Sequence, residues 1–244
     1  MTDLPPHDRG VLVEVLARGI RRLTHFTPAR NLPNILRDMS IRSTQEMQAD
    51  KSAVYAATDP ARYDGQPDKI CCSIEYPNIY YLRKARERPD ATNYPDWACL
   101  LLAAKVAAKS GTLFCVRNAS VGRGALLAAG VASLRGCYAP KVSGSGGSLY
   151  TRGPSHLASA PTDIQAEVLV PGPLPLSTVQ AIALPSAALV AQERGRLLQF
   201  GLNPDIVRWI AAPGLFQVDA ILSAIQGGVP IQETPWTEEP EAQV

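Results

Sequence analysis

Short apolar runs with the length and residue types of β-strands recur along the whole chain, and stretches of helical periodicity alternate with them. The strand candidates are residues 23–26, 70–77, 97–104, 111–116, 166–176 and 179–185. The helix candidates are residues 11–22, 31–39, 78–88 and 186–201. Because the two patterns are interspersed and no segment repeats, they constrain the chain to an α+β fold around a central sheet, mostly antiparallel or mixed.

The domain organisation follows from the same pattern. Residues 1–230 are predicted to form one domain, since a chain of 244 residues can bury a sizeable core without disulfides. Residues 231–244 are acidic and contain prolines, so we expect a flexible tail there. Residues 43–69 predict a long surface loop with one short ordered piece. Residues 117–164, rich in Gly, Ser and Ala, fit either a flexible linker or an active-site loop.

Composition excludes several classes of protein. The five cysteines form no CxxC pair, so we interpret them as buried reduced thiols and expect no metal. The N-terminus lacks the regions of a secretory signal and no apolar run is long enough to cross a bilayer, so we expect a cytoplasmic protein without membrane contact. The sequence contains no GxxxxGK[ST], HExxH or GxSxG motif, which disfavours a nucleoside triphosphatase, a zincin and an α/β-hydrolase.

The net charge of +2 is too small to indicate nucleic-acid binding by itself. The basic residues are nevertheless mostly arginine, 18 of 24, and arginine suits bidentate phosphate contacts and stacking on bases. A high-GC coding bias would produce the same composition, so both interpretations stay open.

Three segments bring together residues that can carry chemistry. In the first, His25, Phe26 and Thr27 end a strand that leads into a helix opening with Asn31, and such a group could hold an amide or a ribose. A histidine in this setting can equally be structural. In the second, Arg62 lies in a loop just before a strand, where it could clamp a phosphate or be a solvated residue paired to a nearby aspartate, Asp59 or Asp64.

The third segment is a strand with an acid inside it. Glu167 interrupts the otherwise apolar residues 166–170, so its side chain must face solvent or be buried at a cost. If this carboxylate lies in a cleft, we expect its role to be chemical.

Together these segments resemble the DarT family of ADP-ribosyltransferases. The resemblance is carried by HFT followed by NLxxIL at 25–36, and by QAEVLV at 165–170. Further similar stretches, in the same order, are RYDG at 62–65, CSIEYPNIYY at 72–81, DWACLLL at 96–102 and FCVRNAS at 114–120. They cover most of the chain between about residues 20 and 210.

The resemblance implies a diphtheria-toxin-like fold in which a split central sheet forms a cleft for NAD as co-substrate. It implies that His25 to Thr27 hold the nicotinamide end and that Asn31 lies near the adenosine or its ribose. Glu167 matches the catalytic glutamate, where a carboxylate stabilises the positive charge that develops on the ribose. Arg62 matches the arginine that contacts the phosphates and the target base, and its high pKa favours electrostatic activation over proton abstraction.

The implied acceptor is a nucleobase of single-stranded DNA, and the implied partner is a macrodomain antitoxin that removes the ADP-ribose. The target-binding candidates, from the segment before Glu167, are Tyr138, Tyr150, Arg152 and His156. Residues 70–81 differ from the corresponding strand of thymidine-modifying members, so we expect guanine ahead of thymine. Transfer to RNA, transfer to a protein side chain, and a noncatalytic nucleotide- or nucleic-acid-binding domain remain the alternatives.

Overall fold

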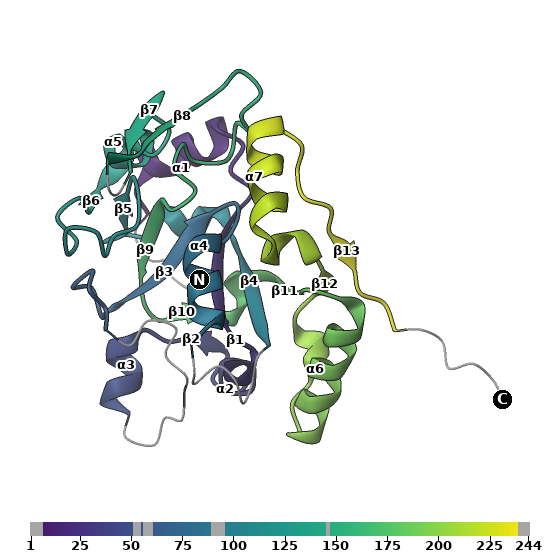
Figure 1. Ribbon diagram of the computed structural model, residues 1–244. Helices are drawn as coiled ribbons and strands as arrows, with labels where there is room; N and C mark the ends of the chain where they lie inside the picture. The colour runs from purple at the N-terminus through teal and green to yellow at the C-terminus, as the bar shows by residue number, and fades with distance from the viewer. Residues whose placement is uncertain (1–6, 51–54, 56–60, 89–95, 145–146, 239–244) are drawn as a thin grey trace.

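The computed structural model describes residues 7–50, 55, 61–88, 96–144 and 147–238. These residues form a mixed sheet of nine strands, in the order β13-β12-β11-β4-β1-β3-β9-β5-β6, with helices on both faces (Figure 1). All strand pairs in this sheet are antiparallel except β11 with β12. The strands of the sheet are β1 (Arg22–Pro28), β3 (Lys69–Ile74), β4 (Trp97–Ala103), β5 (Leu113–Cys115), β6 (Ala128–Ala129), β9 (Glu167–Pro171), β11 (Val179–Leu184), β12 (Trp209–Ala211) and β13 (Thr234–Pro235).

Two small antiparallel pairs complete the described β-structure: β2 (Ser40–Ile41) with β10 (Leu174–Pro175), and β7 (Lys141–Ser143) with β8 (Leu149–Thr151). The helices are α1 (Arg9–Ala17), α2 (Leu32–Arg37), α3 (Thr44–Ala49), α4 (Ile79–Arg86), α5 (Gly130–Gly136), α6 (Ala187–Gln199) and α7 (Val218–Gly227). The expected α+β class is therefore confirmed.

Apolar side chains divide the core into two main clusters, one on each face of the sheet. Helices α1, α2, α5 and α6 contribute to the larger cluster through residues such as Val15, Leu32 and Leu134. Helices α4 and α7 cover the other face, where Leu82 and Ile221 are fully buried. The sheet is thus the middle layer of three, as the labels in Figure 1 show.

The sheet is split along one seam. Strand β1 pairs with β4 over its whole length, from Arg22 opposite Ala103 to Pro28 opposite Trp97. On its other side β1 pairs with β3 only through Leu23↔Ile74 and Thr24↔Ser73. Beyond Thr24 the two strands diverge, so the polar edges of β1 and β3 face each other across a fork. The expected split of the central sheet is realised here as this fork.

Most of the expected elements appear near the predicted positions. The strand predicted at residues 97–104 is β4, which ends at Ala103, and the alanine-rich residues after it form a 3₁₀-helix, η3 (Ala104–Ala108). The helix predicted at residues 31–39 is α2, which buries Leu32 and Leu36 but ends at Arg37, so the prediction was wrong in including Met39. Met39 follows the helix with φ 50° and is 53% exposed, because the chain reverses there to enter β2.

Two expectations about loops and termini differ from the structure. Residues 117–164 contain β6, α5, β7 and β8, so the linker interpretation does not hold for the described part of this segment. Residues 231–238, predicted as the start of a flexible tail, lie against the sheet: Thr234–Pro235 pairs with β12, and the Trp236 N–H donates to the Trp209 carbonyl at 3.0 Å. The boundary predicted at residue 230 is therefore misplaced, and residues 239–244 lie outside the described range.

None of the helices within the described residues has the length and apolar character needed to cross a membrane.

Candidate active site

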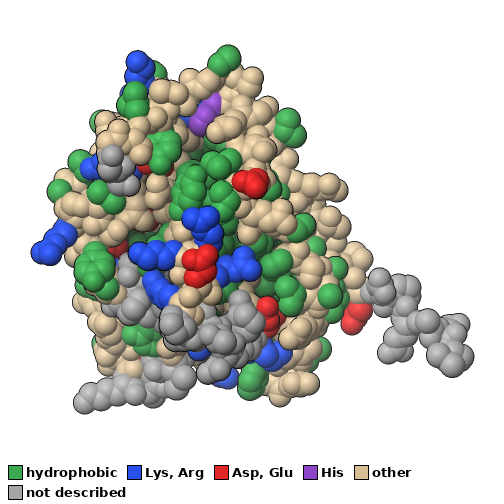
Figure 2. All heavy atoms as spheres, viewed as in Figure 1, with side chains coloured by type: hydrophobic (Ala, Val, Ile, Leu, Met, Phe, Trp, Pro, Cys, Tyr) green, Lys and Arg blue, Asp and Glu red, His purple; other side chains and the backbone are tan. Residues whose placement is uncertain are grey.

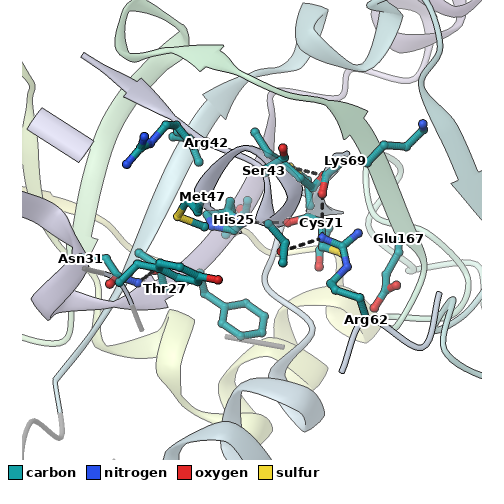
Figure 3. Close-up of a pocket in the computed structure, with 18 of the residues that line it drawn as sticks. His25, Thr27, Asn31, Arg42, Ser43, Met47, Arg62, Lys69, Cys71 and Glu167 are labelled. Atoms are coloured by element: carbon teal, nitrogen blue, oxygen red, sulfur yellow. Dashed lines mark hydrogen bonds between the residues drawn. The ribbon is translucent and has the colours of Figure 1, made fainter. Parts of the chain in front are cut away.

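A pocket opens at the fork between β1 and β3. It contains about 1180 Å³ of empty space, including its open mouth, which is the size of a site for a substantial ligand. Because the two strands diverge, the pocket receives side chains from both faces of the sheet. His25, Thr27 and Met47 line it from one side, and Asn78 and Tyr81 from the other, and Figure 3 shows the labelled part of this wall.

His25 bridges the fork. Its Nδ1 lies 2.7 Å from the Cys71 carbonyl of β3, at the level where the backbone pairing has ended. Burial, together with the nearby Arg62 cation, lowers the pKa of His25, so the ring is neutral at neutral pH. A carbonyl can only accept, so Nδ1 carries the proton and Nε2 is left as an acceptor. Nε2 of His25 can therefore accept a hydrogen bond from a hydroxyl group of a ligand in the pocket.

The residues that follow His25 extend the polar wall. The Asn31 amide donates to the Thr27 hydroxyl at 2.9 Å, which joins the end of β1 to the start of α2. Phe26 also lines the pocket, but its ring packs on the opposite face against Tyr81 and Trp97, with centroid distances of 6.0 and 6.1 Å. Phe26 therefore shapes the pocket as an apolar support.

Glu167, the first residue of β9, presents its carboxylate to the same pocket. Its backbone is held between Ser73 of β3 and Cys115 of β5. The Asn118 amide donates to Oε1 at 3.2 Å and the Ala119 N–H donates to Oε2 at 3.0 Å. Both carboxylate oxygens are thus oriented by the turn after β5, and the side chain is only partly exposed.

Arg62 lies near Glu167 (Figure 3), and its guanidinium is fully engaged by its own loop. Nε donates to Asp64 Oδ1 at 3.2 Å, and Nη2 donates to the Gln66 carbonyl and lies 3.1 Å from Asp64 Oδ2. Nη1 donates to the Lys69 carbonyl at 2.7 Å and to the Thr44 hydroxyl at 3.4 Å. These contacts engage all three nitrogens of the guanidinium.

The backbone conformation and the burial of Arg62 also indicate that this residue has a structural role in its loop. Its φ of 41° lies in the left-handed region, which an L-residue other than glycine adopts at a cost of about 1 kcal/mol. The side chain is 10% exposed. The pairing with Asp64 that we considered from the sequence is present, but it is buried, and it ties the loop over Thr44 and Lys69 to the edge of the pocket.

A sequence model of the family described as "ssDNA thymidine ADP-ribosyltransferase, DarT" matches residues 24–211. The chain belongs to the DarT family. This membership makes it an ADP-ribosyltransferase, as the sequence resemblance implied. A search of curated protein sequences gave no significant match.

Two solved structures share the fold of this DarT family member. The complex of Thermus sp. 2.9 DarT with NAD+ has a TM-score of 0.52 and 15% identity, covering 81% of this chain and 98% of that chain. The carba-NAD+ complex of the same protein has a TM-score of 0.53 and 18% identity, with the same coverage. At these identities the likeness supports the fold alone.

The chemistry of the pocket fits NAD. The neutral His25 offers an acceptor for a ribose hydroxyl, and the carboxylate of Glu167 offers a second. Arg42, Arg62 and Lys69 supply positive charge along the same wall, which suits a pyrophosphate. No cluster of three or more His, Cys, Asp or Glu side chains that could hold a metal occurs among the residues that the structure describes.

Cys71 is the thiol nearest to these groups, and it stays protonated. Burial is the main reason that its pKa is raised well above the usual value, with Glu167 and Asp64 adding to the effect. Its Sγ donates to Asp64 Oδ2 at 3.5 Å. The five cysteines are free, as expected, and Cys71 is a weak donor in the pocket wall rather than a nucleophile.

The four target-binding candidates do not line this pocket. Tyr138 is 6% exposed and its hydroxyl donates to the Ser159 carbonyl at 2.9 Å, so the prediction that it stacks on a base is not supported. Arg152 donates to the Ala160 carbonyl at 2.7 Å, and His156 lies 3.1 Å from the Pro161 carbonyl, so both organise the loop that contains them. Tyr150, on β8, is partly exposed.

Sequence reasoning missed the residues that orient the candidates. Asn118 was part of a matching stretch, but nothing in its surroundings indicated a contact with Glu167, 49 positions away. The Ser43–Glu46 capping box at the start of α3, which places Thr44 and Met47 in the pocket wall, does have a sequence signal, S-x-x-E, that could have been found.

Proposed function

We propose that this chain transfers ADP-ribose from NAD to a thymine of single-stranded DNA at the fork pocket, with release of nicotinamide. The observation that supports this proposal most is the carboxylate of Glu167, which Asn118 and Ala119 orient in the same pocket that contains the neutral His25. The family description names thymidine, so thymine takes precedence over the guanine that residues 70–81 favoured.

The reaction breaks the bond between the ribose C1 and the nicotinamide nitrogen, whose positive charge is neutralised by the bonding electron pair. The thymine N3, the only ring nitrogen that carries a proton in a thymidine, forms the new bond to C1, and its proton passes to water. Glu167 accepts a hydrogen bond from the ribose 2-hydroxyl and stabilises the positive charge that develops on C1. His25 accepts from a second hydroxyl and fixes the position of the sugar.

In this proposal Arg62 is a positioning residue. A clamp on the phosphates would require it to break contacts with Asp64, Gln66 or Lys69, all of which it makes in the present structure. Its charge raises the local potential, and its loop keeps Thr44 and Asp64 in the wall of the pocket. We assign Arg42 and Lys69 to the pyrophosphate, because their ion-pair partners Asp38, Asp50 and Asp68 are more exposed to solvent than Asp64 and hold them less firmly.

The nucleobase transfer, the cytoplasmic location and a reversing partner form one hypothesis. A cytoplasmic location would give the protein access to NAD, and an ADP-ribosyl group on N3 would remove the N–H that thymine donates in base pairing until a partner removed the group. A macrodomain that hydrolyses the ADP-ribosyl bond is the partner implied by the family resemblance. RNA and protein remain the alternative acceptors that the experiment must compare.

The test offers NAD with single-stranded DNA, RNA or protein, followed by mass spectrometry of the nucleosides and peptides. We expect an ADP-ribosyl adduct on thymidine from DNA. An adduct confined to guanosine, to RNA or to protein would overturn the assigned acceptor.

The matched variants are Glu167→Gln and Glu238→Gln, since Glu238 is an exposed acid away from the pocket. Glu167→Gln keeps the shape of the side chain but removes its charge, so we expect transfer to fall about 100-fold or more while NAD binding changes only a few-fold. Glu238→Gln should behave as wild type. Full activity of Glu167→Gln would favour a different catalytic group.

A further inference from the structure

We propose that the exposed face of α4 binds the phosphate backbone of the single strand whose target base enters the fork pocket. This inference rests on the proposed function, because it concerns the path of the same DNA substrate. The surface consists of Arg83, Lys84 and Arg86 on α4 together with Arg88, two residues after the helix ends, and we call it the α4 basic face.

Helix α4 starts at the pocket and leads away from it. Asn78, which caps the helix by accepting from the Tyr81 N–H at 3.2 Å, lines the pocket, and so does Tyr81 in the first turn. The Tyr81 ring contacts Phe26 of β1. A nucleotide seated in the pocket therefore has the α4 basic face next to it, within the roughly 12 Å that a helix of eight residues spans.

The two sides of α4 differ sharply in composition. Ile79, Leu82 and Ala85 are buried on the sheet, whereas four of the other five positions from 83 to 88 are basic. Glu87 is the single acid among them. Figure 2 shows Lys and Arg side chains gathered over the region where Figure 1 places α4. In a chain whose net charge is only +2, this is a marked local excess of positive charge.

Several basic residues elsewhere pair with an acid, whereas Arg83, Lys84 and Arg86 do not within the described part of the chain. Arg18, Arg42, Arg194 and Arg196 each form an ion pair with an acid. Within the described part of the chain, no ion pair involves Arg83, Lys84 or Arg86, and all three are exposed. Neighbouring exposed cations without an acidic partner give a surface that attracts a polyanion and releases its counterions on binding.

Contacts within the protein involve only half of this set. The helix dipole favours the basic residues of the last turn, Arg83, Lys84 and Arg86, without occupying their charged groups. Arg88 donates to the Tyr81 hydroxyl at 3.0 Å, and Arg86 reaches the Phe216 carbonyl at 3.5 Å. Arg83 and Lys84 are exposed and have no hydrogen-bonding partner among the described residues. Their charges are available to a ligand.

Aromatic residues accompany the charges. Tyr80 and Tyr81 are both partly exposed at the start of α4, and the Arg88 guanidinium lies 5.7 Å from the centre of the Tyr81 ring. Cations that follow the backbone beside aromatic rings that stack on bases are the usual composition of a surface for single-stranded nucleic acid. A double-stranded ligand would not present its bases to these rings.

The test measures binding of a fluorescent single-stranded DNA by anisotropy over a range of salt concentrations. The variant is Arg83→Glu with Lys84→Glu. If these two residues contact two phosphates, the slope of log affinity against log salt concentration should decrease in magnitude by about 1.4. Affinity at low salt should fall by roughly tenfold or more. NAD affinity and the melting temperature should stay at the wild-type values.

The matched control is Lys105→Glu with Arg208→Glu, which makes the same change in net charge at exposed positions outside the pocket and outside α4. It should retain most of the affinity and the wild-type salt slope. Equal losses in both double variants would show that only the overall charge matters and would overturn the α4 basic face.

The outcome also separates this inference from the proposed function. If the wild type modifies single-stranded DNA and the α4 variant modifies it equally well, the function stands and the α4 basic face is wrong. If the wild type modifies no DNA at all, the proposed acceptor is wrong and the inference falls with it.

Discussion

His25, at the fork between β1 and β3, makes the free energy of unfolding depend on pH. The folded protein lowers its pKa, mainly through burial, so the native ring resists protonation while the ring in the unfolded chain titrates near pH 6.5. Below that pH the unfolded state binds a proton that the native state does not bind. The contribution of His25 to the free energy of unfolding is therefore fully present above pH 6.5 and is lost as the pH falls toward the native pKa.

The corresponding prediction compares wild type with His25→Gln, which cannot titrate. The free energy of unfolding of wild type relative to the variant should decrease between pH 7.5 and pH 5.5, as measured by urea denaturation. A difference that stays constant over this range would show that the ring is protonated in the native state as easily as in the unfolded one.

Asn118 is the residue on which the orientation of Glu167 depends most directly. Asn118→Ala removes the amide that donates to Oε1 while the Ala119 N–H still donates to Oε2, so we expect the carboxylate to sample orientations that are unproductive. Transfer should fall about 10- to 100-fold with little change in NAD affinity, because a misplacement of about 1 Å has effects of this size. Steady-state kinetics would measure this change.

Asn203→Ala is the control for this variant. It removes an exposed asparagine whose side chain also accepts from a backbone N–H, at Asp205, on a short helix outside the pocket. It should leave kcat unchanged. A similar loss of activity in both variants would mean that Asn118 acts only through stability.

At the level of elements, the fork depends on how β1 is fastened to the end of β3. Glu75, fully buried with φ 63°, accepts from the Arg21 N–H at 2.6 Å and from its guanidinium at 3.1 Å. The Glu75 carbonyl accepts from Arg22 Nε and from the Thr24 hydroxyl. These bonds close the seam at one end, just where the backbone pairing is restricted to two residue pairs.

Glu75→Ala should therefore destabilise the protein by about 1–3 kcal/mol, because the Arg21 N–H loses its partner. Glu75→Gln, which keeps an acceptor, should have a smaller effect. Hydrogen exchange is expected to increase in residues 22–28 and 69–74 before it increases elsewhere. Asp68→Ala, at an exposed position, is the control and should change stability by no more than about 0.5 kcal/mol.

Elements of this kind were predictable where a local signal exists. The runs around β3, β4, β9 and β11 have strand composition, and α6 has both a serine cap and the expected closing glycine, Gly201 with φ 70°. The fork had no such signal, since it depends on where β1 leaves β3. Glu167 could be recognised as a candidate from the sequence because its neighbours are apolar. Asn118 could not, because the residue that it contacts, Glu167, is 49 positions away in the sequence.

At the scale of the whole molecule, the last described residues act as part of the sheet. Their acidic, proline-containing composition predicted a flexible tail, because the local sequence does not show that these residues contact a distant part of the chain. The distant residue is Arg22, whose side chain is 6% exposed and forms an ion pair with Glu233. Trp236 contributes on the same segment, since its ring lies 4.3 Å from the Arg194 guanidinium.

Truncation tests this arrangement. Removal of residues 231–244 leaves the buried Arg22 without its carboxylate partner, exposes the β12 edge and ends the contact of the Ile231 N–H with the Tyr76 hydroxyl. We expect a loss of about 3–5 kcal/mol in the free energy of unfolding, the size observed when one partner of a buried ion pair is removed. Removal of residues 239–244 alone should leave stability unchanged, and Glu233→Gln should reproduce part of the larger loss. If both truncations denature at the same urea concentration as the full chain, residues 231–238 contribute nothing to the folded state and the boundary at residue 230 was correct.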